Sequence, residues 1–311
     1  MHRPVLTLVL LLGLTPPAVA QESESHEPAI GGYAVFTGDG SPADLDEVVS
    51  AMNDVDVVFL GEQHNDPTGH QLELFLLRAA YSSYGSARPV VLSLEMFESD
   101  VQHVLNEYLA GYIRESDFLK AARPWSNYET DYKPLIEFAK ENEIAVMASN
   151  APGRYTSMAR RRGLESLDSL SSFARYVLPH DRATGSVSQA VANPSDRLSE
   201  KFWEEMQDMD GHGSMPSIAE MLVAQNLRDA TMAYWIANKL GPSRPLVIHI
   251  NGSFHSEDGL GVPEHLGRFA PEAETLFVTI RTEEDFHRAP DSSSNDFVIQ
   301  TDASLIPDEE Q

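Results

Sequence analysis

The sequence has no cysteine among its 311 residues. Disulfide bonds, thiolate chemistry and lipid attachment through an N-terminal cysteine are therefore excluded. Basic side chains are also scarce: 22 Lys and Arg residues stand against 48 Asp and Glu residues, and only five of the basic residues are lysine. A surface this acidic is a poor partner for nucleic acid and for anionic membranes. We interpret it as adaptation to a salt-rich habitat, with simple solubility as the alternative.

The sequence has one long apolar run, at its very start. Val5–Leu14 follows Arg3, precedes Ala18–Ala20, and is too short to cross a bilayer comfortably. This pattern is typical of a secretory signal peptide that is cut after residue 20. We therefore expect an exported protein, periplasmic or secreted, that is soluble, has no stable membrane insertion and is not a lipoprotein.

Five shorter apolar runs, rich in β-branched residues, predict the strands of a buried parallel sheet. They lie at 56–60, 89–97, 143–150, 245–252 and 274–281. Helical periodicity lies between most of them, at 68–82, 98–109, 115–122 and 132–141. This alternation predicts an α/β fold with an open, mostly parallel β-sheet flanked by helices.

Residues 154–240 have helical periodicity and no convincing strand, so we expect a smaller helical subdomain inserted before the fourth core strand. Near the start of the chain, Ser41 and Pro42 predict a helix with Ser41 as its N-cap. The predicted division is a signal peptide at 1–20, a mobile lead-in at 21–32, the α/β domain at 33–153 and 241–288, the helical subdomain at 154–240, and a linker, an edge strand ("FVIQT") and an acidic tail at 289–311.

Polar side chains stand where the predicted strands end, which is where open parallel sheets bind ligands. Glu62 and His64 are two residues apart and point the same way in an extended chain. Glu95 lies inside an apolar run, so its carboxylate requires a partner such as a histidine, an arginine or a metal. The fourth run ends at Asn251 and continues to His255. We interpret these residues as one site, although strand ends are polar in most proteins.

Other polar residues allow two interpretations each. Gln225 and Asp229 fall in the centre of the apolar stripe of a predicted helix at 217–240 and need partners, either as a satisfied core pair or as lining of a cleft. His70 could serve the site or be a solvated residue at a helix start. Arg154 could pair with the protein's own acids or hold an anionic ligand.

Four segments occur in order: "FLGEQHNDPTGHQ", "LSLEMFE", "QNLRDATMA" and "HINGSFHSEDGLGVPEHL". With them the sequence resembles the ChaN-like haem-binding uptake family of the Tiki and erythromycin-esterase superfamily, over roughly residues 50 to 270 without much of the helical middle. The resemblance implies an exported, iron-related haem-binding protein with an α/β domain and a smaller helical one. The superfamily's GExH element falls on Gly61, Glu62 and His64, its later acid on Glu95, and its NGxxH-like element on Asn251, Gly252 and His255.

The first functional hypothesis is haem binding in iron uptake. Haem needs an axial ligand such as tyrosine or histidine, an apolar slot, and cationic or backbone donors for its propionates. The resemblance also implies a homodimer that shares haem between subunits. The candidate haem-binding residues are His64, Tyr155, Tyr176, His212, Gln225, Asp229, Asn251 and His255.

The second hypothesis is a metal-dependent hydrolase, because the resemblance links the matching residues in the Tiki and esterase branches to metal-dependent proteolysis or ester hydrolysis. Here His64, Glu95 and His255 would hold a divalent metal such as zinc, with Glu62 or Glu95 as the general base. The residues do not decide between the two hypotheses, so enzymatic activity is an open question at this point.

Overall fold

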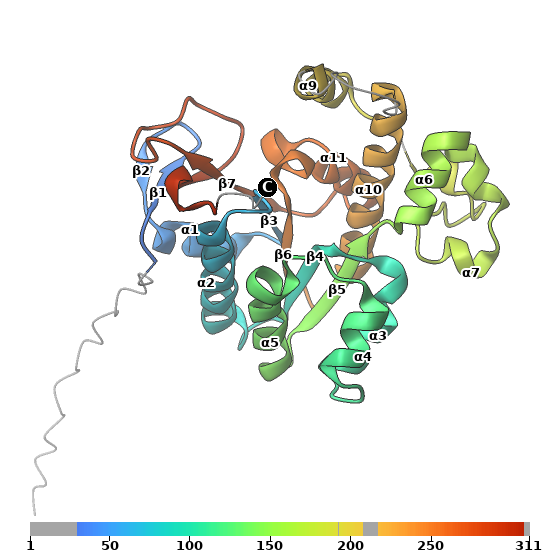
Figure 1. The fold of residues 1–311 in the computed structure, drawn as a ribbon, viewed down its shortest axis with the longest axis horizontal. Coiled ribbons are helices and arrows are strands. Elements are labelled where there is room, and N and C mark those ends of the chain that lie inside the picture. The colour runs from blue at the N-terminus through green and yellow to red at the C-terminus, as the bar shows by residue number, and fades with distance from the viewer. Residues whose placement is uncertain (1–29, 192, 208–216, 308–311) are drawn as a thin grey trace, which may run out of the picture.

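Eight strands form a mixed sheet in the order β2-β1-β8-β7-β3-β6-β4-β5 in the part of the chain that the structure describes. This computed structural model describes residues 30–307 apart from residue 192 and residues 208–216. The strands from β8 to β5 run parallel, and β1 pairs antiparallel with β8 and β2. The predicted α/β fold with a mostly parallel sheet is confirmed (Figure 1). Residues 1–20, predicted as a signal peptide, and His212 lie outside the described residues.

The five predicted core strands are all present, as β3 to β7. The strands are β1 Tyr33–Thr37, β2 Pro42–Ala43, β3 Val57–Glu62, β4 Val90–Glu98, β5 Ala145–Asn150, β6 Leu246–Gly252, β7 Thr275–Glu283 and β8 Phe297–Asp302. The α-helices are α1 Leu45–Ala51, α2 Pro67–Tyr84, α3 Gln102–Leu109, α4 Glu115–Ala122, α5 Lys133–Glu141, α6 Gly153–Arg162, α7 Ser172–Arg175, α8 Val187–Ala190, α9 Asp196–Gln207, α10 Ile218–Lys239 and α11 Val262–Phe269.

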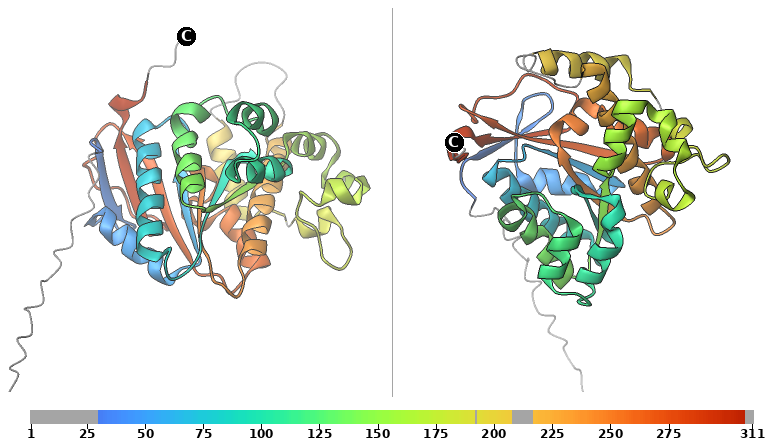
Figure 2. Two further views of the ribbon diagram at one scale, coloured as in Figure 1. Left: turned by 90° about the horizontal axis from the view of Figure 1, so that it is seen from below. Right: turned by 45° about the vertical axis from the view of Figure 1, so that its right-hand side comes forward.

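Helices cover both faces of the sheet. Since successive side chains of a strand point to opposite faces, each central strand contributes to two cores. Val58 and Leu60 of β3 belong to a core that also contains side chains of α1, α2 and α5. Val57 and Phe59 belong to a second core with side chains of α10 and α11. Figures 1 and 2 show the sheet between these two helical layers. Burial on both faces explains why the central strands read as continuous apolar runs.

The helical insertion before the fourth core strand is confirmed, since the described residues between β5 and β6 form α6 to α10 and no strand. Its own core contains Tyr155 of α6 and Leu227 of α10. Further along α10, Met232 and Ile236 pack against the sheet, so this helix joins the insertion to the sheet. The domain limits at 154 and 240 stay a prediction. None of the helices in the described residues is long and apolar enough to cross a membrane.

Two details of the prediction are wrong. The segment "FVIQT" forms β8, which lies between β7 and β1 rather than at an edge. All five of its residues are buried, and the short strands β1 and β2 continue the sheet beyond it. Ser41 is not a helix cap, because Pro42–Ala43 pair with β1. The helix begins at Leu45 instead, where the carboxylate of Asp44 accepts a hydrogen bond of 2.8 Å from the Glu47 backbone N–H.

Candidate functional site

The carboxyl ends of β3, β4 and β6 meet at one edge of the sheet. Glu62, the last residue of β3, is in register with Gly252, the last residue of β6. The backbone N–H of Gly252 donates a hydrogen bond of 2.8 Å to Oε2 of Glu95 on β4. The predicted convergence of these strand ends is therefore present in the structure.

Two glycines allow the loops after β3 and β6 to lie against each other. A Cβ atom on Gly252 would lie 2.9 Å from Cε1 of His64, and one on Gly61 would lie 3.0 Å from Cα of Ser253. Each loop follows the pattern Gly-x-x-His, and each glycine faces the other loop. The close approach thus leaves no room for a side chain at Gly61, where the neighbour is backbone, whereas at Gly252 the neighbour is the side chain of His64.

On the α10 face of the sheet, His255 lies between two carboxylates. Its Nε2 is 3.1 Å from Oε1 of Glu95, and its Nδ1 makes a short contact with Oδ1 of Asp229. Nε2 of Gln225 lies 2.8 Å from the same Nδ1. We call Glu95, Gln225, Asp229 and His255 the α10 cluster. The partner that Glu95 requires is thus His255, and Asp229 shares this partner, with the Gln225 amide beside the same ring.

The charges in the α10 cluster stabilise one another. Burial lowers the pKa of His255, but the negative charges of Glu95 and Asp229 outweigh this effect and raise the pKa to about 10. Burial raises the pKa of Glu95, but the charge and hydrogen bond of His255 outweigh it and lower the pKa to about 2. Burial raises the pKa of Asp229 despite the neighbouring His255. His255 is therefore held as an imidazolium ion.

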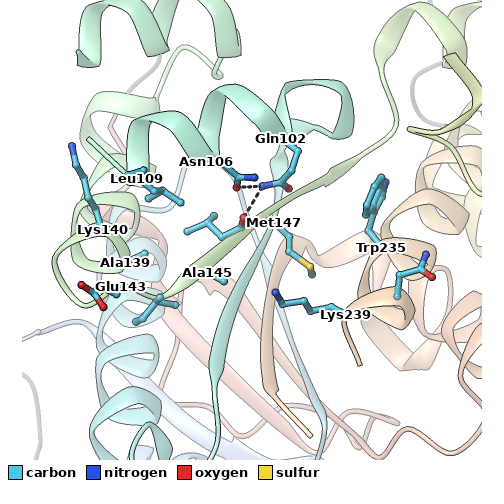
Figure 3. Close-up of a pocket in the computed structure, with 14 residues that line it drawn as sticks. Gln102, Asn106, Leu109, Ala139, Lys140, Glu143, Ala145, Met147, Trp235 and Lys239 are labelled. Atoms are coloured by element: carbon cyan, nitrogen blue, oxygen red, sulfur yellow. Dashed lines mark hydrogen bonds between the residues drawn. The ribbon is translucent and has the colours of Figure 1, made fainter. Parts of the chain in front are cut away.

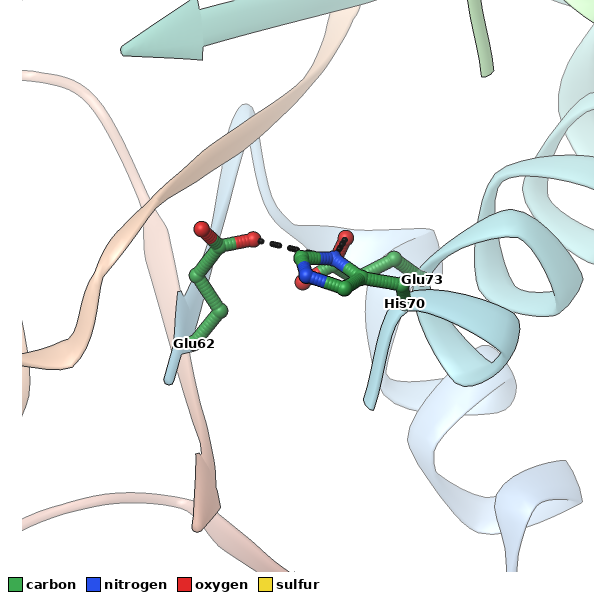
Figure 4. Close-up of side chains that lie close together, drawn as sticks. All are labelled: Glu62, His70 and Glu73. Atoms are coloured by element: carbon green, nitrogen blue, oxygen red, sulfur yellow. Dashed lines mark hydrogen bonds and ion pairs between the residues drawn. The ribbon is translucent and has the colours of Figure 1, made fainter. Parts of the chain in front are cut away.

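On the opposite face, Glu62 meets residues from α2 and from the turn before α5. Oε1 of Glu62 accepts a hydrogen bond of 2.6 Å from the Tyr132 hydroxyl. Nδ1 of His70 lies 3.1 Å from Oε2 of Glu73 and 3.5 Å from Oε2 of Glu62 (Figure 4). Nε2 of His70 lies 3.6 Å from Oδ2 of Asp131. We call Glu62, His70, Glu73, Asp131 and Tyr132 the α2 cluster.

The carboxyl groups of the α2 cluster behave in the opposite way to Glu95. Burial and the negative charge of Glu73 raise the pKa of Glu62 to about 8. Burial likewise raises the pKa of Glu73 to about 8. The ligand-forming atoms of Glu62, His70 and Glu73 all lie within 4.8 Å of one another. These three residues could therefore hold a metal ion.

His64 lies between the two clusters and reaches the surface. Its Nδ1 is 2.6 Å from Oε1 of Glu62, and 47% of its side chain is exposed. Burial lowers the pKa of His64, but the hydrogen bond and the charge of Glu62 outweigh it and raise the pKa above the usual value. The Trp125 ring meets the imidazole edge-on, with 4.7 Å between centroids.

A pocket of about 820 Å³ opens beside His64. Its walls include the Trp125 ring and two prolines, so much of its surface is apolar. The lining residues are His64, Asn65, Pro67, Trp125, Ser126, Asn127, Thr130, Asp131 and Pro307. Its size is within the range of small-molecule and cofactor sites.

A second pocket, of about 710 Å³, lies beside β5 at the edge of the sheet (Figure 3). It includes Ala145, the first residue of β5, whereas the acid–histidine clusters lie at the strand carboxyl ends. At its rim, Nε2 of Gln102 donates to the carbonyl of Val146 at 2.9 Å, and the N–H of Ala148 donates to Oε1 of Gln102 at 2.7 Å. The lining residues contain no acid–histidine cluster, so we place the functional site at the first pocket.

The structure does not bring all predicted residues to this site. Tyr155 is buried in the core of the helical insertion, and Tyr176 is exposed with its ring against Trp235. Asn251 is buried and donates to Oγ of Ser256 at 2.9 Å, so it orders its own loop. His212 falls outside the described residues.

Sequence reasoning missed Glu73, Trp125, Asp131 and Tyr132, and it left His70 open between a role in the site and a solvated helix start. One signal was available, because His70 and Glu73 are three residues apart and share a helix face. Arg154 forms an ion pair with Asp100, which is the first of its two interpretations.

Comparison with known proteins shows the family. Residues 48–266 match the family described as haem-binding uptake, Tiki superfamily, ChaN. This match covers more than half of the chain, and the chain belongs to that family. A curated relative is Protein RETICULATA-RELATED 5, chloroplastic, from Arabidopsis thaliana, which is 25% identical over 246 residues. The matched region covers 75% of this chain but 32% of that protein, so the chain spans about a third of the relative's length.

Solved structures confirm the fold. A structure of cofacial haem binding to ChaN of Campylobacter jejuni has a TM-score of 0.63 and 13% identity, and the match covers 86% of this chain and 96% of that one. An erythromycin esterase structure is a more distant match, with a TM-score of 0.41, 12% identity, and coverage of 80% of this chain and 77% of that one. The first similarity establishes the fold, and the second is too weak to support an argument.

Proposed function

We propose that this member of the haem-binding uptake family binds haem in the pocket beside His64. The observation that supports this most directly is the position of the half-exposed imidazole at an apolar-walled pocket. Nδ1 of His64 is hydrogen-bonded to the Glu62 carboxylate, which leaves Nε2 to bind iron. A histidine ligand whose other nitrogen donates to a carboxylate is the usual arrangement at protein-bound metals.

The pocket fits the iron and the macrocycle better than the propionates. Trp125, Pro67 and Pro307 provide apolar surface for a flat ring. Among the described residues that line the pocket, none is lysine or arginine, and polar donors come from Asn65, Ser126 and Thr130. We therefore propose that the propionates face the solvent-exposed rim. When bound, haem would supply an iron atom whose reactivity depends on its axial ligand.

The biological setting belongs to the same proposal. We propose that the chain is exported and takes part in haem uptake, since family membership supports that role and residues 1–20 have the pattern of a signal peptide. A homodimer that shares haem between subunits is also part of the proposal. Neither point affects how His64 is expected to bind iron.

A haemin titration of the mature chain tests the binding proposal. We expect a Soret band that saturates at a fixed ratio of haemin to protein, and a loss of at least about tenfold in affinity for His64→Ala. His103→Ala is the matched control, because His103 is exposed on α3. Equal Soret titrations for the parent chain and His64→Ala would refute His64 as the ligand.

A second candidate function is hydrolysis, favoured by the α10 cluster, which haem binding in the pocket does not use. Glu95, His255 and Asp229 form a buried acid–base array next to His64. Both ring nitrogens of His255 already face carboxylates. In a hydrolase of this kind His255 would therefore donate a proton, and would not bind a metal together with His64 and Glu95 as the sequence predicted. Hydrolysis of p-nitrophenyl acetate, with and without zinc, tests the idea. Activity that His255→Gln does not reduce would refute it.

A further inference from the structure

In the α2 cluster a single imidazole, that of His70, faces the carboxylates of both Glu62 and Glu73. Nε2 of His70 lies 3.2 Å from the backbone carbonyl oxygen of His64. A carbonyl oxygen can only accept a hydrogen bond, so Nε2 carries a proton. Nδ1 then faces Oε2 of Glu73 and Oε2 of Glu62. One imidazole nitrogen therefore has to satisfy two buried carboxylates.

Two carboxylate oxygens of the cluster have no hydrogen-bond partner in the described part of the chain: Oε2 of Glu62 and Oε1 of Glu73. Glu62 is 2% exposed and Glu73 is fully buried. A proton on Nδ1 of His70 would serve Oε2 of Glu73 and leave both of these oxygens unpaired. Buried carboxylates are costly unless a cation or a hydrogen-bond donor compensates them.

We propose that Glu62, His70 and Glu73 hold a divalent transition-metal ion of the zinc type. An ion with bonds of about 2.0–2.1 Å in tetrahedral geometry has neighbouring ligand atoms about 3.3 Å apart. The distances of 3.1 Å and 3.5 Å from Nδ1 of His70 to the two carboxylates lie on either side of this value. Two carboxylates and an imidazole form a familiar set of ligands for such an ion.

The surroundings of these ligands are also those of a metal centre. His70 donates its other ring N–H to a backbone carbonyl, which fixes the tautomer that leaves Nδ1 for the metal. The second oxygen of Glu62 accepts from Tyr132 and lies 2.6 Å from Nδ1 of His64. A doubly charged ion would neutralise both buried carboxylates. It would also fix Glu62, and through Glu62 the orientation of His64 at the pocket.

This site is distinct from the predicted set of His64, Glu95 and His255. It lies on the α2 face of the sheet, whereas Glu95 and His255 lie on the α10 face. It shares with the haem proposal only Glu62, which contacts His64 through its other oxygen. The metal site and haem binding can therefore be tested separately.

The experiment strips the mature chain with a chelator, removes the chelator, and titrates the protein with zinc or manganese by calorimetry. We expect one ion per chain and a rise in the thermal midpoint. Glu73→Gln should bind the ion at least about 100-fold more weakly, because it loses a charged ligand. Its far-ultraviolet circular dichroism should match that of the parent chain, because glutamine has nearly the same volume.

Two controls separate the site from general effects. His103→Gln combined with Glu107→Gln removes an exposed histidine and an exposed glutamate from α3, and should bind zinc as the parent chain does. His64→Ala should also retain zinc even if it loses haemin.

The proposal fails if the stripped parent chain binds neither ion, or if Glu73→Gln binds as tightly as the parent chain. It also fails if His64→Ala loses zinc, since the ion would then be bound at His64. Loss of haemin binding alone, with zinc retained, would leave this site intact.

Discussion

The α10 cluster and the α2 cluster lie on opposite faces of the same sheet edge and are built from the same residue types. In the α10 cluster the imidazole of His255 lies between two carboxylates, and the pKa of Glu95 falls to about 2. In the α2 cluster the pKa of Glu62 rises to about 8. The difference comes from the neighbours of each carboxyl group. Glu95 lies against the charged imidazole of His255, whereas Glu62 is buried beside a second carboxyl group, that of Glu73.

Removal of the central imidazole of the α10 cluster should have the largest effect. His255→Ala leaves Glu95 and Asp229 buried without their cation, which should destabilise the protein by about 3–5 kcal/mol. Urea denaturation monitored by tryptophan fluorescence measures this change. A loss below about 1 kcal/mol would mean that the α10 cluster is not charged as described.

The stability of the metal-free protein should depend on pH through the α2 cluster. The pKa values of Glu62 and Glu73 in the folded state are about 8, above the ordinary value of 4.5. Between pH 4.5 and pH 8 the folded state therefore binds more protons than the unfolded state. The resulting stabilisation of the folded state is complete below about pH 4.5 and is lost as the pH rises through 8.

The difference between the parent chain and Glu73→Gln isolates this effect. We expect the stripped parent chain to lose about 2 kcal/mol relative to Glu73→Gln between pH 6 and pH 8, at a slope of up to about 1.4 kcal/mol per pH unit for one group. Urea midpoints in the presence of a chelator measure the difference. The urea midpoint of Glu107→Gln, a substitution on the exposed face of α3, should change with pH in parallel with that of the parent chain. Parallel curves for Glu73→Gln as well would contradict the raised pKa values.

Loss of one of the two acids around His255 should cost less than loss of the histidine. Asp229→Ala leaves His255 paired with Glu95 and should cost about 1–3 kcal/mol, as expected when a buried hydrogen-bonded group loses one partner. Urea denaturation again provides the measurement. A midpoint equal to that of the parent chain would place Asp229 outside the network.

The smallest effect on stability is expected where the two loops touch. The φ angle of Gly252 is −53°, which alanine readily adopts. The added Cβ would press on the half-exposed ring of His64, and that side chain can move. Gly252→Ala should therefore cost less than about 1 kcal/mol, within the usual range for a tolerated substitution, yet weaken haemin binding. Unchanged haemin affinity would show that the position of His64 does not matter.

The sequence predicts one cluster better than the other for a physical reason. Glu62 and His255 follow apolar runs and Glu95 lies inside one, and the carboxyl ends of parallel strands meet at one edge, so their convergence can be predicted from the pattern alone. His70 stands at the start of a helix, a place that is usually solvated. It is buried here because the Tyr132 ring and the Asp131 carboxylate lie against it, and these are contacts between residues that are far apart in the sequence.

The remaining misses have a similar origin. Trp125 and Tyr132 come from the segment between α4 and α5, and tertiary packing alone decides which strand end they approach. Tyr155 and Tyr176 were predicted from residue type without a positional signal, and neither lines the pocket. Strand β8 is not the predicted edge strand, because the amino-terminal strand β1 pairs with its free side.

The amide of Gln102 has a consequence for how this protein meets other chains. Strand β5 is at the edge of the sheet, where unpaired backbone groups can recruit a strand from another molecule. Gln102 donates to Val146 and accepts from Ala148, and so occupies the positions that a peptide unit of an added strand would take. An incoming strand would first have to displace this side chain. This part of the edge is therefore protected against strand addition, and two copies could not pair their β5 strands here while Gln102 stays in place.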